Sequence, residues 1–291
     1  MQSPCESHHS FFYGVPYLFY WNTTSRNPII KVQDSYNIIR FWAHNGLLIL
    51  GLLIAALNFL VQFCAPAAYG KHAPLKVTCP VEVRLSNIFA HFIPGLLIFT
   101  VMYFLSGNNL LGITNIILYS LFTVHYLFRG LLAPLMFRYS HSRLSARIPL
   151  TTFLLNTIYH CTNADFIGSV FYCKGYFYDP RFIIGALLFV IGLIINWSAD
   201  IQLILLRTSR HDKDYILPRG VLFSLISCPN YFGECVEWLG WTIATWSLAG
   251  LIWWLYVVSV LGTRAIHNHN WYKDQFSSYP QRRKAIIPFI Y

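Results

Sequence analysis

The stretch PNYFGECVEWLGWTIATWSLAG, residues 229–250, decides the fold of this 291-residue chain. It is apolar apart from a few side chains, among them Asn230, Glu234 and Glu237, which are spaced i, i+4 and i+7. On a helix this spacing places the three side chains in one stripe. Carboxylates at membrane depth are costly unless something binds beside them. The stretch therefore predicts a membrane helix with one polar, functional face.

A second polar stripe ends an earlier apolar segment. Asn196, Asp200 and Arg207 are spaced i, i+4 and i+11, which places an amide, a carboxylate and a cation on one helix face. One interpretation is a structural ion pair between helices. The other is a site for a phosphate-bearing ligand, with Arg207 at the phosphate and Tyr215 in the following loop. The chain has no GxGxxG or P-loop motif, so no Rossmann or Walker site is indicated.

A third stripe lies where the last apolar run ends. Arg264, Asn268 and Tyr272 follow an i, i+4, i+8 pattern. We predict that this stripe and the one at 230–237 form two walls of one polar pocket near the cytosolic surface. His267 and His269 flank the stripe, but residues two apart do not face each other on a helix, so no metal site is predicted.

A polar group also lies inside an earlier apolar segment, at His125, Tyr126 and Arg129. Tyr126 and Arg129 are three residues apart and share a face. A cation in mid-span needs a partner or water. The structural interpretation is an interhelical pair beside an anchored tyrosine. The functional interpretation is that Tyr126 donates a hydrogen bond to a substrate carbonyl.

The composition indicates an integral membrane protein. Hydrophobic residues make up 56% of the chain and charged residues 11%, against about 25% charged in soluble proteins. The net charge of +10 comes from basic residues spread over short loops, which argues against nucleic-acid binding. Seven cysteines show no CxxC and no metal-binding spacing.

Hydropathy predicts an all-α fold of about seven transmembrane helices in one bundle. Residues 1–45 are predicted to form a lumenal N-terminal segment, and residues 46–291 the membrane domain. The last two apolar runs are short, so a re-entrant pair is an alternative there. The predicted spans are Gly46–Phe63, Asn87–Leu105, Leu110–Leu132, Ile148–Tyr172, Phe182–Leu206, Tyr231–Trp246 and Leu251–Gly262.

The basic residues predict the topology. Fifteen lysines and arginines fall in the loops 64–86, 135–147 and 207–230 and in the tail from Arg264, and five fall on the opposite side. The positive-inside rule then places the C-terminus in the cytosol and the N-terminus in the lumen.

Several segments resemble the steroid 5-alpha-reductase family. The resemblance rests on Pro-Asn-Tyr-Phe-Gly-Glu at 229–234, Glu237-Trp238, Ala-Thr-Trp-Ser-Leu at 244–248 and Tyr-Pro-Gln-Arg-Arg-Lys-Ala-Ile-Ile-Pro-Phe at 279–289. It continues more weakly back to Tyr69-Gly-Lys-His72.

The resemblance implies that NADPH binds inside the helix bundle. Glu234 would hold the nicotinamide amide rather than shuttle protons. The family often has histidine where this chain has Asn268. The implied cofactor-binding residues are Tyr69, Asn196, Asp200, Arg207, Tyr215, Asn230, Glu234, Arg264, Asn268 and Tyr272.

The resemblance also implies a substrate site. Tyr126, in a His-Tyr pair typical of the family, would contact the steroid 3-ketone, and Arg129 and Trp238 would bind the substrate. The family usually supplies a second contact from a glutamate seven residues before the proline that matches Pro94, where this chain has Asn87. Asn87 can donate through its amide but cannot act as a neutral carboxylic acid. Either a weaker donor suffices or the substrate differs.

The predicted function is NADPH-dependent reduction of the Δ4 double bond of 3-oxo-Δ4 steroids to 5-alpha-3-oxosteroids. A monomer in the endoplasmic reticulum membrane is expected, with a lipophilic steroid-like substrate entering from the bilayer. The alternatives are a trans-2-enoyl-CoA or polyprenol reductase of the same superfamily, an isoprenylcysteine-type methyltransferase, and a sterol-binding protein without activity.

Overall fold

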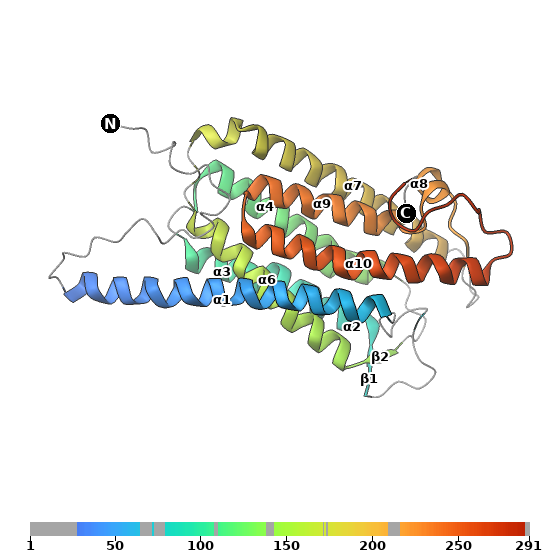
Figure 1. Ribbon diagram of the computed structural model, residues 1–291, viewed down its shortest axis with the longest axis horizontal. Helices are drawn as coiled ribbons and strands as arrows, with labels where there is room; N and C mark the ends of the chain where they lie inside the picture. The colour runs from blue at the N-terminus through green and yellow to red at the C-terminus, as the bar shows by residue number, and fades with distance from the viewer. Residues whose placement is uncertain are drawn as a thin grey trace.

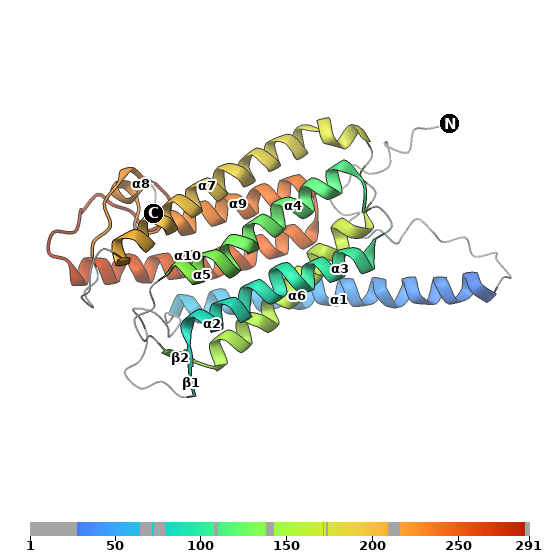
Figure 2. The ribbon, with the colours of Figure 1, turned by 180° about the vertical axis from the view of Figure 1, so that it is seen from behind.

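The computed structural model describes residues 28–64, 72, 79–107, 110–137, 143–170, 172, 174–208 and 216–288. Its long helices run side by side along one axis and form an elongated bundle (Figures 1 and 2). Two short strands and the helix α8 lie toward the same end of the bundle (Figure 1).

The first half of the chain forms α1, two interrupted helices and α6. Both interrupted helices contain a π-helical segment, η2 with Pro94 inside it and η3 just after Tyr126. π-Segments of this kind are frequent at functional sites. The bounds are α1 Pro28–Cys64, β1 Pro80–Glu82, α2 Val83–Asn87, η2 Ile88–Ile98, α3 Phe99–Ser106, α4 Ile113–Leu127, η3 Phe128–Leu132, α5 Ala133–Met136, β2 Arg143–Ser145 and α6 Arg147–Ser169. The strands pair antiparallel, with Val81 opposite Leu144.

The second half contains α7, α9 and α10, the three helices that carry the polar stripes. α9 and α10 are joined by a tight turn at Trp246, whose backbone is left-handed with φ 49°. Ser247 caps α10 by accepting a hydrogen bond from the Gly250 N–H at 2.9 Å. The bounds are η4 Lys174–Tyr178, α7 Pro180–Thr208, α8 Val221–Leu225, α9 Pro229–Thr245 and α10 Leu248–Gln275.

Within the described residues, five helical stretches are long and apolar enough to cross a membrane. They confirm a helical fold and are consistent with a membrane bundle. α6 and the 17-residue α9 are not among them, so the total of seven spans stays a prediction. The five are Ile39–Cys64, Val83–Ser106, Ile113–Met136, Pro180–Leu206 and Leu248–Gln275.

Two helices are longer than their apolar runs predicted. α1 begins at Pro28 instead of Gly46, and its 37 residues span about 55 Å. α10 continues to Gln275, beyond the predicted end at Gly262. Both extensions carry polar residues, which hydropathy alone assigns to loops.

A polar network joins α1 to α3 and α6. It lies toward the end of the bundle opposite β1 and β2 (Figure 1). Arg40 forms an ion pair with Asp165 on α6, and His44 Nδ1 lies 2.7 Å from the Asp165 Oδ2. Ser106 donates to the same carboxylate at 2.9 Å. A buried carboxylate needs such partners, since an unpaired one would be strongly destabilising.

Glycines bring α7 and α9 into backbone contact. Gly185 and Gly192 on α7 are seven residues apart, as are Gly233 and Gly240 on α9. A Cβ on any of the four would meet backbone atoms of the other helix. On Gly233 it would lie 2.5 Å from the backbone nitrogen of Asn196. Small residues allow such close approach of helices in membranes. The contact places the polar stripe of α7 directly against that of α9.

Gly192→Ala is expected to lower the free energy of unfolding by about 1–3 kcal/mol, because the added methyl group would overlap the Glu237 backbone. Titration with SDS in mixed micelles measures the change. Gly262→Ala on α10 is the matched control, since its Cβ would have no neighbour within 4 Å. Equal stability of the two variants would contradict close packing of α7 on α9.

Candidate active site

The stripes of α7 and α9 meet at Asp200. The Asn230 Nδ2 donates to Asp200 Oδ1 at 2.9 Å. From η3, Arg129 Nη1 lies 3.7 Å from Asp200 Oδ2. The ion pair is the structural interpretation offered for Arg129, and it links three helices. The structure therefore brings together three residues that the sequence placed in separate motifs.

A second polar contact joins α4 to α9. His125 Nδ1 lies 2.7 Å from Glu237 Oε1, and their side chains are 1% and 0% exposed. Asn196 on α7 also interacts with the Glu237 carboxyl group. Glu234, one turn away, interacts electrostatically with Arg129 and His125. Sequence analysis placed Glu237 on the polar stripe but did not identify His125 as its partner.

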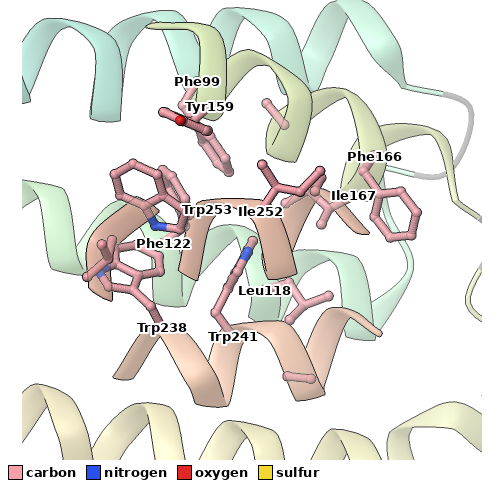
Figure 3. Packing of buried hydrophobic residues seen from close by; sticks show 14 of the residues in the cluster. Phe99, Leu118, Phe122, Tyr159, Phe166, Ile167, Trp238, Trp241, Ile252 and Trp253 are labelled. Atoms are coloured by element: carbon pink, nitrogen blue, oxygen red, sulfur yellow. The ribbon is translucent and has the colours of Figure 1, made fainter. Parts of the chain in front are cut away.

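Tyr126 lies at the centre of an aromatic core next to these polar contacts. Its ring centroid is 5.0 Å from that of Phe122 and 6.0 Å from that of Trp238. Figure 3 shows Phe122 and Trp238 adjacent within this core. A Cβ on Gly95 would overlap the Tyr126 ring, so only glycine leaves room for it there. Within the described part of the chain, the Tyr126 hydroxyl makes no hydrogen bond.

Asn87 lies at the junction of α2 and η2 and is half-buried. Its Nδ2 donates to the Val83 carbonyl oxygen of its own helix at 2.9 Å. At least one amide N–H is thus directed along the helix. A role for Asn87 as second carbonyl donor stays a prediction.

The polar residues of α10 lie against the start of α9. The Arg264 Nε donates to the Tyr231 hydroxyl at 3.1 Å. Asn268 Oδ1 lies 3.1 Å from His72 Nε2, and its Nδ2 contacts the Cys228 sulfur at 3.6 Å. The third stripe therefore extends the polar surface along α10 at this end of the bundle.

The C-terminal tail packs over this end. Ser227 forms hydrogen bonds with His269 Nδ1 at 2.7 Å and with the Tyr279 hydroxyl at 2.6 Å. The Lys284 carbonyl accepts from the Ser227 N–H at 2.8 Å. Burial raises the pKa of Tyr279. The tail thereby fixes the segment before α9 and places Tyr279 against Tyr272, whose ring centroid is 6.3 Å away.

Sequence analysis missed Arg283, which the tail carries into this region. Its side chain is 3% exposed and lies over the Tyr279 ring at 5.1 Å. Its Nη2 donates to the Pro218 carbonyl oxygen at 3.3 Å, while Nε and Nη1 have no partner among residues 216–288 or the other described ranges. Burial lowers the pKa of Arg283. Arg283 stands between Arg282 and Lys284, and nothing in this basic run marks it as the buried residue of the three.

Three predicted cofactor-binding side chains lie outside the described part of the structure. Tyr69 and Tyr215 lie outside the described residues. Arg207 lies in the last turn of α7, but its side chain is outside the description.

A model of the family described as 3-oxo-5-alpha-steroid 4-dehydrogenase matches residues 146–291, the second half of the chain. The chain belongs to this family. Steroid 5-alpha-reductase DET2 of Arabidopsis thaliana is 38% identical over 200 residues, covering 66% of this chain and 76% of the relative. The 3-oxo-5-alpha-steroid 4-dehydrogenase 2 of Macaca fascicularis is 35% identical over 249 residues, covering 82% and 94%. The 3-oxo-5-alpha-steroid 4-dehydrogenase 1 of Bos taurus is 40% identical over 182 residues, covering 60% and 68%. The predicted family and enzyme type are confirmed.

The residues at this end of the bundle are chemically suited to a nucleotide cofactor. Glu237 Oε2 is buried without a hydrogen-bond partner in the described chain, and a carboxylate oxygen accepts from an amide. The unpartnered donors of Arg283 are the kind that bind phosphate. The set therefore supplies acceptors for an amide or ribose and a cation for phosphate, and it fits NADPH.

Proposed function

We propose that this protein reduces the Δ4 double bond of 3-oxo-Δ4 steroids to 5-alpha-3-oxosteroids with NADPH. The carrying observation is the buried Tyr126 side chain, whose ring lies among aromatic rings and next to His125 of the His125–Glu237 pair. Family membership supports this reaction over enoyl-CoA reduction, polyprenol reduction and methyl transfer.

Tyr126 donates a hydrogen bond to the substrate carbonyl in this proposal. Negative charge develops on that oxygen during reduction, and a donor already positioned in a water-excluded site stabilises it. Trp238 is fully buried beside Tyr126 and provides an apolar surface for a flat ring system. Arg129, paired to Asp200, holds positive charge close to the site.

Bound NADPH supplies the hydride. The proposed binding residues lie on α7, α9 and α10. Asp200 and Asn230 form one hydrogen-bonded unit, and Asn196 lies one turn before Asp200 on the same helix face. Glu234 accepts from the nicotinamide amide. Arg264 and Arg283 would bind the phosphates, and Arg207, Tyr215 and Tyr69 would complete the set, as proposed from sequence.

The proposal includes a multi-pass protein of the endoplasmic reticulum membrane, acting as a monomer. Exposed apolar side chains on the outer helices support access of a lipophilic substrate from the bilayer. The basic loops and tail support a cytosolic C-terminus. In sealed vesicles of the endoplasmic reticulum, a protease added from outside should digest a tag placed after Tyr291. A protected tag would be lumenal and would contradict this orientation.

Incubation of membranes containing this protein with NADPH tests the reaction. We expect a 3-oxo-Δ4 steroid to gain two hydrogens, as measured by mass spectrometry of the products. Trans-2-enoyl-CoA and a polyprenol serve as competing substrates in parallel. Reduction of one of these, with the steroid unchanged, overturns the substrate assignment.

A further inference from the structure

His160 on α6 is a buried polar residue that none of the contacts above involves. Its side chain is 0% exposed, and neither ring nitrogen has a hydrogen-bond partner among the described residues. Buried polar groups are nearly always hydrogen-bonded, so this exception requires an explanation. A ligand that is absent from the structure would provide the partner.

His160 is next to the proposed carbonyl donor. Its ring centroid lies 4.6 Å from that of Tyr126 and 5.0 Å from that of Trp253 on α10. The indole N–H of Trp253 and that of Trp238 also lack partners in the described chain. The two indole rings are 5.4 Å apart (Figure 3). Three helices thus bring unpartnered polar atoms to one place beside Tyr126.

The neighbouring histidines are already held by protein groups. His125 contacts Glu237, and His91 Nδ1 lies 3.2 Å from the amide nitrogen of Asn156. Both interact electrostatically with His160, which places the three rings in one region. His160 alone of these three has no hydrogen-bond partner on either nitrogen within the described residues. A neutral imidazole always carries one N–H donor.

We propose that His160 is a substrate-binding residue that donates a second hydrogen bond to the carbonyl oxygen of the 3-oxo-Δ4 steroid, beside Tyr126. This inference rests on the proposed function. It assigns to His160 the second donor that sequence analysis expected at Asn87, whose amide nitrogen donates to the Val83 carbonyl oxygen of its own helix. The competing occupant is a buried water, which also needs two or more polar partners.

Ligand pairs that differ only in the carbonyl test the proposal. Purified protein with NADP+, which has no hydride to transfer, is titrated with androst-4-en-3-one and with androst-4-ene. Quenching of tryptophan fluorescence reports binding, because Trp238 and Trp253 lie beside the site. We expect the parent protein to bind the ketone more tightly, and His160→Phe to lose about five- to tenfold of that preference.

Variants at and beside His160 separate binding from folding. His160→Phe removes both nitrogens and keeps an aromatic ring, so unfolding should occur at the same or a higher temperature. His160→Gln keeps an N–H donor and should retain the preference for the ketone. Tyr159→Phe is the control, because its hydroxyl donates to the Gly51 carbonyl at 2.7 Å; it should lose stability and keep the preference.

The outcomes distinguish the two proposals. An unchanged preference for the ketone in His160→Phe overturns the role of His160, including the case where a water occupies the space, and leaves the function standing. Equal loss of preference in Tyr159→Phe also overturns it, since the effect would then follow from packing. A parent protein that binds neither steroid overturns the proposed function, and the role of His160 with it.

Discussion

Tyr126→Phe is expected to lower kcat for steroid reduction by about 100- to 1,000-fold, the usual cost of losing one donor to a developing oxyanion. The ring stays in place, because Phe122, His125 and Trp238 surround it. Removing the hydroxyl leaves no described protein group without a partner, so the variant should fold normally. Turnover at saturating steroid and NADPH measures the loss, and the KM for NADPH should not change.

Tyr119→Phe is the matched control for this variant. Tyr119 lies on the same helix, and its hydroxyl is 3.0 Å from the Thr100 hydroxyl. It has no contact with the buried polar residues of α9, so its kcat should stay close to the parent value. If Tyr126→Phe also kept full activity, the carbonyl would have to bind elsewhere, with His160 and Asn87 as the remaining donors.

The spacing of residues predicted which side chains share a helix face, but not what each face meets. The stripe of Asn230, Glu234 and Glu237 follows directly from the 3.6-residue repeat. Its partners on other helices depend on how the helices pack, and glycines such as Gly192 and Gly233 set that packing. The contact of Glu237 with His125 therefore became visible only in three dimensions.

Residues without a pattern were the hardest to predict. His160 lies in a segment of mixed polarity, where a lone histidine carries no spacing signal. Asp165 is likewise isolated in sequence, and its partner Arg40 belongs to the part of α1 that hydropathy left outside the membrane domain. A carboxylate inside an apolar span does require a partner, so Asp165 was the one detectable clue.

Glu237→Leu is expected to lower the free energy of unfolding by about 1–3 kcal/mol, the usual cost of leaving a buried hydrogen-bonding group without its partner. The leucine would leave the His125 Nδ1 without its partner, in a region that water does not reach. Titration with SDS in mixed micelles measures the loss. Glu237→Gln is the matched control: its side-chain carbonyl still accepts from His125, so we expect a loss of about 0.5–1.5 kcal/mol.

The double variant His125→Leu with Glu237→Leu decides what the pair contributes. Replacing both partners of a buried hydrogen bond by apolar residues can be nearly neutral or stabilising, so the second substitution should recover much of the lost stability. Recovery of stability with activity still lost would mean that the pair is kept for the chemistry beside Tyr126. If Glu237→Leu alone were as stable as the parent, Glu237 would not serve folding. Its unpartnered Oε2 would then indicate that the carboxylate is retained for a bound ligand.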